Sequence, residues 1–307
     1  MTSSRAASSA TGSIYDLGYR GYEGPRLGRR HAIRALYAHS LKVCYGIGRG
    51  GRAKIAPVVL GGFATIPAIV GIGVLALARQ LGAPSGVIED ASPIQHATYF
   101  GIIATLVMLF CAAQVPEVLG RDQRHSLLSL YFSRALRRED YAIARFAGVV
   151  AAILIFVLLP QTIIFVGFVL SAPDVAAEFG KELALVPPIL TQGALISVLL
   201  GSVSAAIASF TPRRLYATTA IIVILAVVPV VGGVLTRLDA STLSRFVALA
   251  SPMDILEATN AILFGTTAGS EVISEADLPD FAYFAAAALI TAASIAILVR
   301  RFRKIAA

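Results

Sequence analysis

The stretch FAGVVAAILIFVLLPQTIIFVGFVLSAP, which runs from Phe146 to Pro173, contains no charged side chain. A helix rises about 1.5 Å per residue, so about 20 residues cross a hydrocarbon core about 30 Å thick. This stretch is therefore long enough to span a membrane as one helix. It predicts that the chain folds in lipid rather than in water.

Five more windows of similar length also contain no charged side chain: Ile55–Ala78, Ala91–Pro116, Leu183–Pro212, Leu215–Thr236 and Phe281–Val299. Only 14% of the 307 residues are charged and 57% are hydrophobic, whereas soluble domains have about 25% charged residues. A buried helix of a soluble protein could explain one such window but not six. We therefore predict an all-α polytopic membrane protein whose six transmembrane helices lie at about residues 55–78, 94–116, 146–170, 184–210, 215–236 and 281–299.

The prolines inside these windows are compatible with helices. We expect Pro67, Pro160 and Pro229 to kink their spans. We expect Pro57 and the Pro187–Pro188 pair to lie in first turns, where a missing N–H is harmless.

The loop charges predict the orientation. Residues 1–54, 117–145, 213–214 and 300–304 contain 22 of the 26 Lys and Arg residues, and the other loops contain twelve of the 18 acidic residues. Because cytoplasmic loops of membrane proteins are rich in Lys and Arg, both termini are predicted to be cytoplasmic. The net charge of +8 then reflects topology and anionic lipid heads, and no nucleic-acid partner is expected.

The segments outside the spans divide the chain further. We expect residues 1–26 to form a cytoplasmic leader. Its first dozen residues, rich in Ser, Ala and Thr, are typical of a disordered tail. The alternating aromatic and Gly residues from Tyr15 to Pro25 favour an irregular strap over a poorly ordered leader. Residues 27–54 form an amphipathic connecting helix and a glycine-rich elbow before the transmembrane domain of residues 55–299. Residues 300–307 form a basic cytoplasmic tail.

The loop between spans two and three is the most informative cytoplasmic segment. Residues 117–141 combine dense charge with apolar residues at helical spacing, which indicates a docking surface with charges for steering and apolar anchors for grip. A solvated loop lying on lipid is the alternative. The candidate docking residues are Glu117, Arg121, Arg124, Leu127, Leu130, Tyr131, Arg134 and Arg138.

This segment resembles the coupling-helix region of the membrane subunits of ABC-2-type ABC transporters. The residues that match the family pattern by type are Glu117, Arg121, Asp122, Arg124, Leu127, Leu130, Ser133, Arg134, Leu136, Arg138, Asp140 and Tyr141. The sequence departs from the pattern at Ala135, where the family has proline, and at Arg145, where it has lysine. The tyrosine- and glycine-rich leader is similar to one found in actinobacterial members.

The resemblance implies a six-span permease subunit in the cell membrane, with cytoplasmic termini and a coupling helix between spans two and three. It further implies a separate ATPase subunit that binds ATP and Mg²⁺, and a second permease half that is either identical or different. The chain has no phosphate-binding GxxxxGK[ST] loop of its own, so we expect no ATP hydrolysis and no cofactor in it. The charge-free windows favour an externally powered transporter, since ion-coupled transporters place ionisable groups in the membrane. The expected cargo is hydrophobic or amphipathic and exported.

Residues 246–270 are divided by Asp254 and Glu257 into runs too short to span, so we expect a pair of interfacial or re-entrant helices there. By the resemblance, such helices between spans five and six form an extracellular constriction. Gln114, Thr218 and Thr219 are candidate pathway residues, if spans two and five meet a partner.

Other chemistries have less support. The four histidines are scattered, so no metal site is expected, and His96 is interpreted as an interfacial residue. The carboxylates of residues 237–280 are interpreted as a solvated rim rather than as a catalytic cluster, and no catalytic residue is proposed. A non-transporting membrane scaffold that recruits a cytoplasmic partner is the alternative function.

Overall fold

The computed structural model describes residue 24 and residues 27–82, 94–133, 136–237 and 247–304. All regular structure within these residues is helical. Six helices are long and apolar enough to cross a membrane: Gly51–Gln80, His96–Arg124, Arg138–Ser171, Val175–Phe210, Arg214–Leu235 and Asp280–Lys304. The predicted all-α architecture with six spans is thus confirmed.

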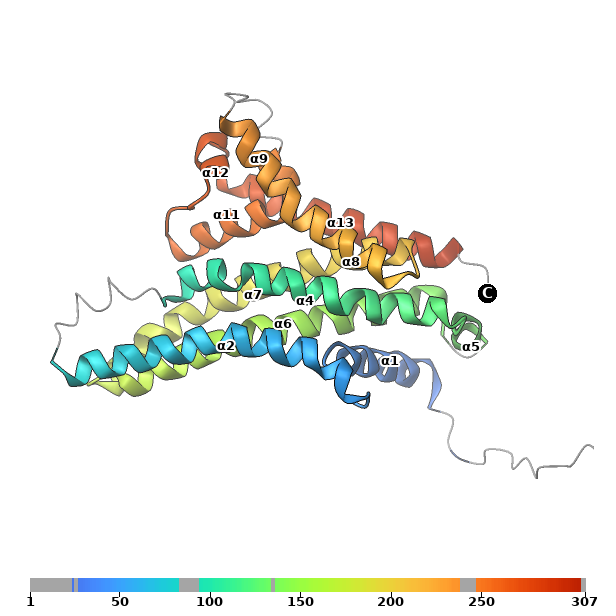
Figure 1. The fold of residues 1–307 in the computed structure, drawn as a ribbon, viewed down its shortest axis with the longest axis horizontal. Coiled ribbons are helices and arrows are strands. Elements are labelled where there is room, and N and C mark those ends of the chain that lie inside the picture. The colour runs from blue at the N-terminus through green and yellow to red at the C-terminus, as the bar shows by residue number, and fades with distance from the viewer. Residues whose placement is uncertain (1–23, 25–26, 83–93, 134–135, 238–246, 305–307) are drawn as a thin grey trace, which may run out of the picture.

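The elements follow the order of Figure 1. The spans are α2 (Gly51–Gln80), α4 (His96–Arg124), α6 (Arg138–Ser171), α7 (Val175–Phe210), the continuous run of α8 (Arg214–Ile222), η1 (Val223–Val227) and α9 (Val228–Arg237), and α13 (Asp280–Lys304). The shorter helices are α1 (Gly28–Cys44), α5 (Leu128–Phe132), α11 (Pro252–Phe264) and α12 (Glu271–Ala276).

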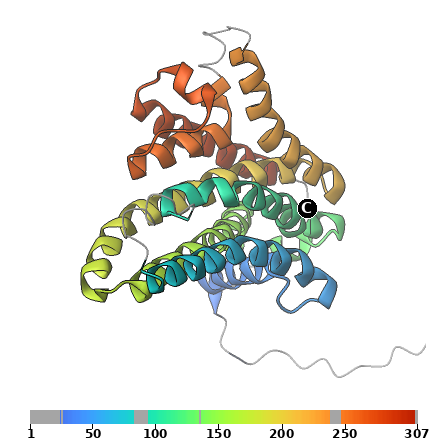
Figure 2. The ribbon, with the colours of Figure 1, turned by 60° about the vertical axis from the view of Figure 1, so that its left-hand side comes forward.

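The helices α4, α6 and α7 form the centre of the bundle, with α2 on one side and α8, α9 and α13 on the other (Figures 1 and 2). The helices α1 and α5 and the last turn of α13 lie at one end, which we call the α5 end. The helices α11 and α12 lie at the opposite end, which we call the α11 end. The charged residues predicted to face the cytoplasm thus gather at the α5 end.

The two flanks of the bundle expose large aliphatic side chains. Val58 of α2 is 68% exposed and Val230 of α9 is 65% exposed, and many neighbouring aliphatic side chains on these helices are also exposed. A water-soluble protein rarely leaves so much contiguous apolar surface open. Together with the six apolar helices, these flanks define a multi-pass membrane protein.

The predicted amphipathic helix before the first span is present as α1. Its buried residues, Leu36, Ser40, Val43 and Cys44, lie on one face, which packs on α6 and α4. The apolar side of the helix is therefore covered by protein. A turn of residues 45–50 then leads into α2, where the elbow was predicted.

The fourth span begins earlier than predicted. The Asp174 carboxylate accepts hydrogen bonds from the backbone N–H groups of Ala176 and Ala177, both at 3.0 Å, and so starts α7 at Val175. Because of this cap, Pro187 and Pro188 lie in the helix interior, and the prediction of a first-turn position for them is wrong. Pro57 likewise lies inside α2.

The fifth span contains a π-helical turn, Val223–Val227. Pro229 follows it and has no N–H to donate to the Leu225 carbonyl, four residues earlier. A wider turn before a proline is a common way for a helix to absorb that missing bond. The proline therefore modifies this span without ending it.

Asp254 and Glu257 both lie inside the one helix α11, so the prediction that they divide residues 246–270 into a pair of short helices is wrong. The second short helix, α12, begins at Glu271, beyond that range. Neither is among the six spanning helices. The predicted leader apart from residue 24, the last three residues of the predicted basic tail (305–307) and Arg134 lie outside the described residues.

Candidate partner-docking surface

The helix α5 is a single turn that joins α4 to α6 at the α5 end (Figure 1). Its first residue, Leu128, is only 6% exposed and anchors the turn in the hydrophobic core. Leu130 points the other way and is 63% exposed. The turn therefore buries one leucine in the protein and leaves another exposed on the surface.

A buried arginine lies beneath α5. Arg145 of α6 is 1% exposed and forms an ion pair with Asp122 of α4. The Tyr141 hydroxyl also donates to Asp122, at 2.7 Å, and the Arg145 Nη1 group donates to the Ser40 hydroxyl of α1 at 3.2 Å. One guanidinium thus connects α1, α4 and α6.

The same arginine reaches α5 through aromatic rings. Its guanidinium carbon lies 5.4 Å from the centre of the Tyr141 ring and 5.9 Å from that of Tyr131. The Tyr141 ring in turn packs on Phe302 of α13, with ring centres 5.2 Å apart. A cation between aromatic faces in a dry site is worth about 2 kcal/mol, so α5 is held firmly on the bundle. We call Ser40, Asp122, Tyr131, Tyr141 and Arg145 the arginine network.

A second cluster surrounds Glu117, one turn before the network on α4. Its carboxylate pairs with Arg49 of the elbow at 2.5 Å, with Arg124 at 3.3 Å and with Arg214 of α8 at 3.7 Å. Three arginines from separate parts of the chain thus meet one carboxylate that is 11% exposed. This cluster fixes the entry to α2 and the start of α8 relative to α4.

Replacement of Glu117 by glutamine should therefore loosen the α5 end. We expect a loss of about 1–2 kcal/mol in the free energy of unfolding, because the charge-assisted bonds weaken while three like charges remain close together. Thermal unfolding in detergent measures this effect. Glu139→Gln removes the same charge from a side chain that is 47% exposed and serves as the control, with little change expected. Equal behaviour of the two variants would contradict the role of the cluster.

The start of α6 is tied to both neighbours. Arg29 of α1 forms two parallel bonds to Asp140, at 2.6 and 2.7 Å. Glu139 pairs with Arg303 of α13 at 2.7 Å, and Arg138 donates to the Arg303 carbonyl at 2.9 Å. The α5 end is consequently a connected frame of α1, α4, α6 and α13.

The predicted docking residues differ in how exposed their side chains are. Leu130 and Arg124 are exposed, Arg121, Leu127, Tyr131 and Arg138 are half-buried, and Glu117 is buried. Tyr131 and Glu117 are occupied by contacts within the chain. The surface open to a partner is therefore centred on Leu130, and several residues predicted to touch the partner support that surface from below.

Sequence reasoning did not single out Ser40, Arg49, Arg145 or Arg214 as site residues. A partial signal exists, since Tyr141 and Arg145 are four residues apart and share one helix face. Their partners, however, come from other helices.

The three candidate pathway residues do not gather in one cavity. Thr218 donates to the Ala112 carbonyl of α4 at 2.8 Å and so joins α8 to α4. Gln114 is buried, and Thr219 is exposed. Their role in a pathway stays a prediction.

The α11 end holds buried charges that the sequence analysis did not expect. His96 is 3% exposed rather than interfacial, and its Nε2 atom lies 2.9 Å from the Glu182 carboxylate, while Nδ1 contacts the Gln161 side-chain oxygen. Glu182 lies outside the charge-free window but inside α7. The helices are thus longer than the windows and carry ionisable groups at their ends.

Two carboxylates of the predicted solvated rim are also enclosed. Asp254 of α11 is 5% exposed, and Glu257 is half-buried. Burial raises the pKa of both groups above the ordinary range. The interpretation of these two residues as a solvated rim is therefore wrong, because α11 folds back against α4, α7 and α13.

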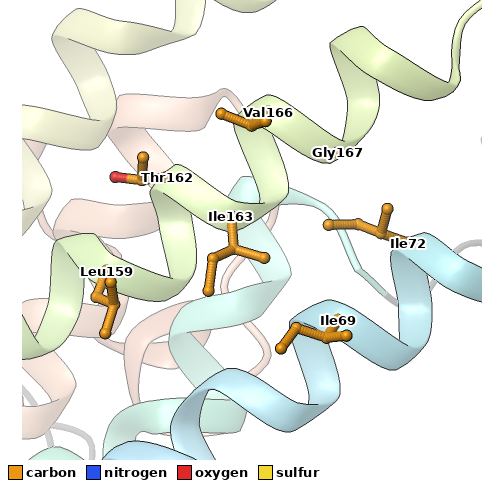
Figure 3. A pocket seen from close by; sticks show the side chains of 7 residues that line it. All are labelled: Ile69, Ile72, Leu159, Thr162, Ile163, Val166 and Gly167. Carbon is orange, nitrogen blue, oxygen red and sulfur yellow. The ribbon is translucent and has the colours of Figure 1, made fainter.

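Figure 3 shows a shallow apolar groove between α2 and α6, lined by Ile69, Ile72, Leu159, Thr162, Ile163, Val166 and Gly167. Its one side-chain hydroxyl, on Thr162, already donates to the Leu158 carbonyl at 2.8 Å. A groove without a free polar group cannot orient a specific ligand. It suits the lipid-facing surface.

Among the described residues, no group of three or more His, Cys, Asp and Glu residues has the arrangement of a metal site. Comparison with known proteins finds no protein-family model and no curated protein that matches this chain. The class that its fold defines is a six-span, all-α membrane protein.

Proposed function

We propose that this chain is the permease subunit of an ATP-powered transporter of the ABC-2 type, and that a separate ATPase subunit docks on the surface centred on Leu130. The observation that carries the proposal is the exposed α5 turn seated on the buried arginine network. A partner that moves α5 acts directly on Tyr131 and Arg145, and through them on α1, α4 and α6. ATP and Mg²⁺ bind to the partner in this scheme.

The rest of the assembly follows from the same scheme. The α5 end faces the cytoplasm of a cell with the protein in its plasma membrane, and the α11 end faces outward. A second permease half, identical or different, covers part of the apolar flanks. The cargo is a hydrophobic or amphipathic compound that is exported, and no chemistry on the cargo is required of this chain.

The docking surface is tested by Leu130→Asp. Because Leu130 contributes apolar contact area to the partner and little to the fold, we expect ATPase binding to fall by at least about tenfold while the unfolding temperature stays unchanged. The measurement is co-purification of a candidate ATPase subunit that carries a phosphate-binding loop, together with its stimulated ATP hydrolysis.

Leu27→Asp is the matched control, since Leu27 is 60% exposed at the beginning of α1. If both variants bind the ATPase as the unchanged protein does, the docking assignment is wrong. ATP-dependent flux into sealed vesicles then separates the transporter from the alternative scaffold, for which binding would occur without flux.

A further inference from the structure

A cavity of about 340 Å³ opens at the α11 end, between the first turns of α4, the helix α11 and the segment that follows it. This volume lies within the range of small-molecule sites. The lining residues with apolar or small side chains include Phe100, Gly101, Ala104 and Met253, and the polar ones include Glu257 and Asn260. The cavity thus has an apolar wall and a polar wall.

Asn260 is held in place by a hydrogen bond to α4. The residue is 8% exposed, and its Nδ2 group donates to the Ala97 carbonyl of α4 at 2.8 Å. This bond fixes the amide, because a flipped side chain would place oxygen against oxygen. The Oδ1 atom is closed to solvent and has no hydrogen-bond partner among the described residues, which costs about 1–3 kcal/mol. Asn260 is therefore a fixed part of the cavity wall.

Glu257 lies one turn before Asn260 on the same helix and supplies the only carboxylate of the lining. Its carboxylate accepts hydrogen bonds from the backbone N–H groups of Gly269 and Ser270, so it is held in place. Among the residues that the structure describes, no lysine or arginine lines this cavity. The charge of Glu257 is therefore left without a positive partner there.

The neighbouring cavity, about 310 Å³, has a different electrostatic character. Its carboxylates, Glu178 and Glu182, lie against Lys181 and His96, at 3.2 and 2.9 Å. Glu178 is thus paired with a basic side chain within the chain, and Glu182 is in contact with an imidazole. The cavity of Glu257 and Asn260 differs because the Glu257 carboxylate has no basic side chain beside it in the described lining.

We propose that this cavity binds an organic ammonium cation, with its N–H groups on the Glu257 carboxylate and its hydrocarbon part on Phe100 and Met253. An anion would find no cationic side chain here. A bare divalent ion such as Ca²⁺ requires six to eight oxygen ligands, whereas the apolar wall suits a hydrocarbon. The excess of acidic residues, seven against two basic ones in residues 237–280, attracts cations to this end.

The site is independent of the ATPase docking surface and goes beyond the proposed transport function. It is tested on the purified full chain in lipid nanodiscs by calorimetric titration with n-hexylammonium. Hexanol is neutral and hexanoate is an anion, and both have the same chain length as the ammonium compound. Comparing the three therefore distinguishes binding due to the positive charge from binding due to the hydrocarbon chain. We expect saturable binding of the ammonium and at least about tenfold weaker binding of the other two, the factor for one lost charge-assisted bond.

Two variants locate the bound probe. Glu257→Gln keeps the shape of the side chain and removes its charge, and it should weaken n-hexylammonium binding by at least about tenfold. Glu275→Gln, an exposed position on α12, removes the same charge outside the cavity and should leave binding unchanged.

Gly101→Leu tests the cavity without removing a polar group. A Cβ atom at Gly101 meets nothing within 4 Å, so the new side chain enters the cavity without a clash and should block binding while the protein stays folded. Gly73→Leu, equally free of neighbours on α2, is the matched control. Equal binding of the three hexyl compounds, or unchanged binding in both Glu257→Gln and Gly101→Leu, would overturn the proposal.

Discussion

Replacement of Arg145 by methionine is expected to lower the free energy of unfolding by about 3–5 kcal/mol, the usual result of removing one partner from a buried ion pair. Arg145 is 1% exposed, and its loss leaves the Asp122 carboxylate without its countercharge. The same change removes the cation between Tyr131 and Tyr141. The effect should therefore reach α5 as well as global stability.

The two cysteines provide the measurement. Cys44 and Cys111 are 1% and 0% exposed, so a thiol-reactive fluorogenic dye labels them only as the protein unfolds. The Arg145→Met variant should become labelled at a markedly lower temperature. ATPase binding at α5 should weaken in parallel, at a temperature where the variant is still folded.

A double variant separates charge from packing. Asp122→Leu with Arg145→Met removes both charges and should recover part of the stability that Arg145→Met loses, since an uncompensated buried charge is worse than an apolar pair. If the double variant loses as much stability, relative to the unchanged protein, as the two single variants lose together, the two residues do not act as a pair.

Replacement of Gly148 by leucine is the second change with a large expected effect. The helices α1 and α6 lie close together there: a Cβ atom at Gly148 would lie 2.5 Å from Ser40 Cβ and 2.9 Å from the Tyr37 carbonyl oxygen. Backbone atoms cannot rotate away, so α1 must move as a whole. Overpacking of this kind costs about 1–3 kcal/mol, and it should also break the bond from Arg145 to Ser40.

Limited proteolysis of the α1 region and the same dye labelling measure this effect. Gly62→Leu on α2, where a Cβ atom meets nothing within 4 Å, introduces the same side chain in open space and should not lower stability. If α1 in Gly148→Leu resists protease as well as in the control, the close approach of α1 and α6 is not a structural requirement.

The fold was largely predictable from the sequence because its signals are local. The run from Phe146 to Pro173 indicates a spanning helix from its length and lack of charge alone. The short helix α5 was also indicated, since residues 127–131 are apolar at helical spacing between charged residues. The helix α11 was indicated only as a region too short to span, and its bounds were not. Helix ends were less predictable: Asp174 extends α7 well beyond its charge-free window.

The candidate site was predictable only as a segment. Residues 117–141 were identified as a docking region, yet the sequence could not tell that Leu130 faces outward while Tyr131 and Glu117 are engaged inside. It also gave no reason to separate Glu257 from the other carboxylates of its loop.

The sequence by itself therefore determined that this protein crosses the membrane six times and that its basic residues gather in alternate loops, because hydrophobic length and charge position are properties of single segments. Only the tertiary structure decided which charges meet. Arg29 and Asp140 are 111 positions apart, and His96 and Glu182 are 86 apart. Such pairs form because packed helices bring distant residues within hydrogen-bonding range, and a buried charge is stable only where that packing supplies its partner.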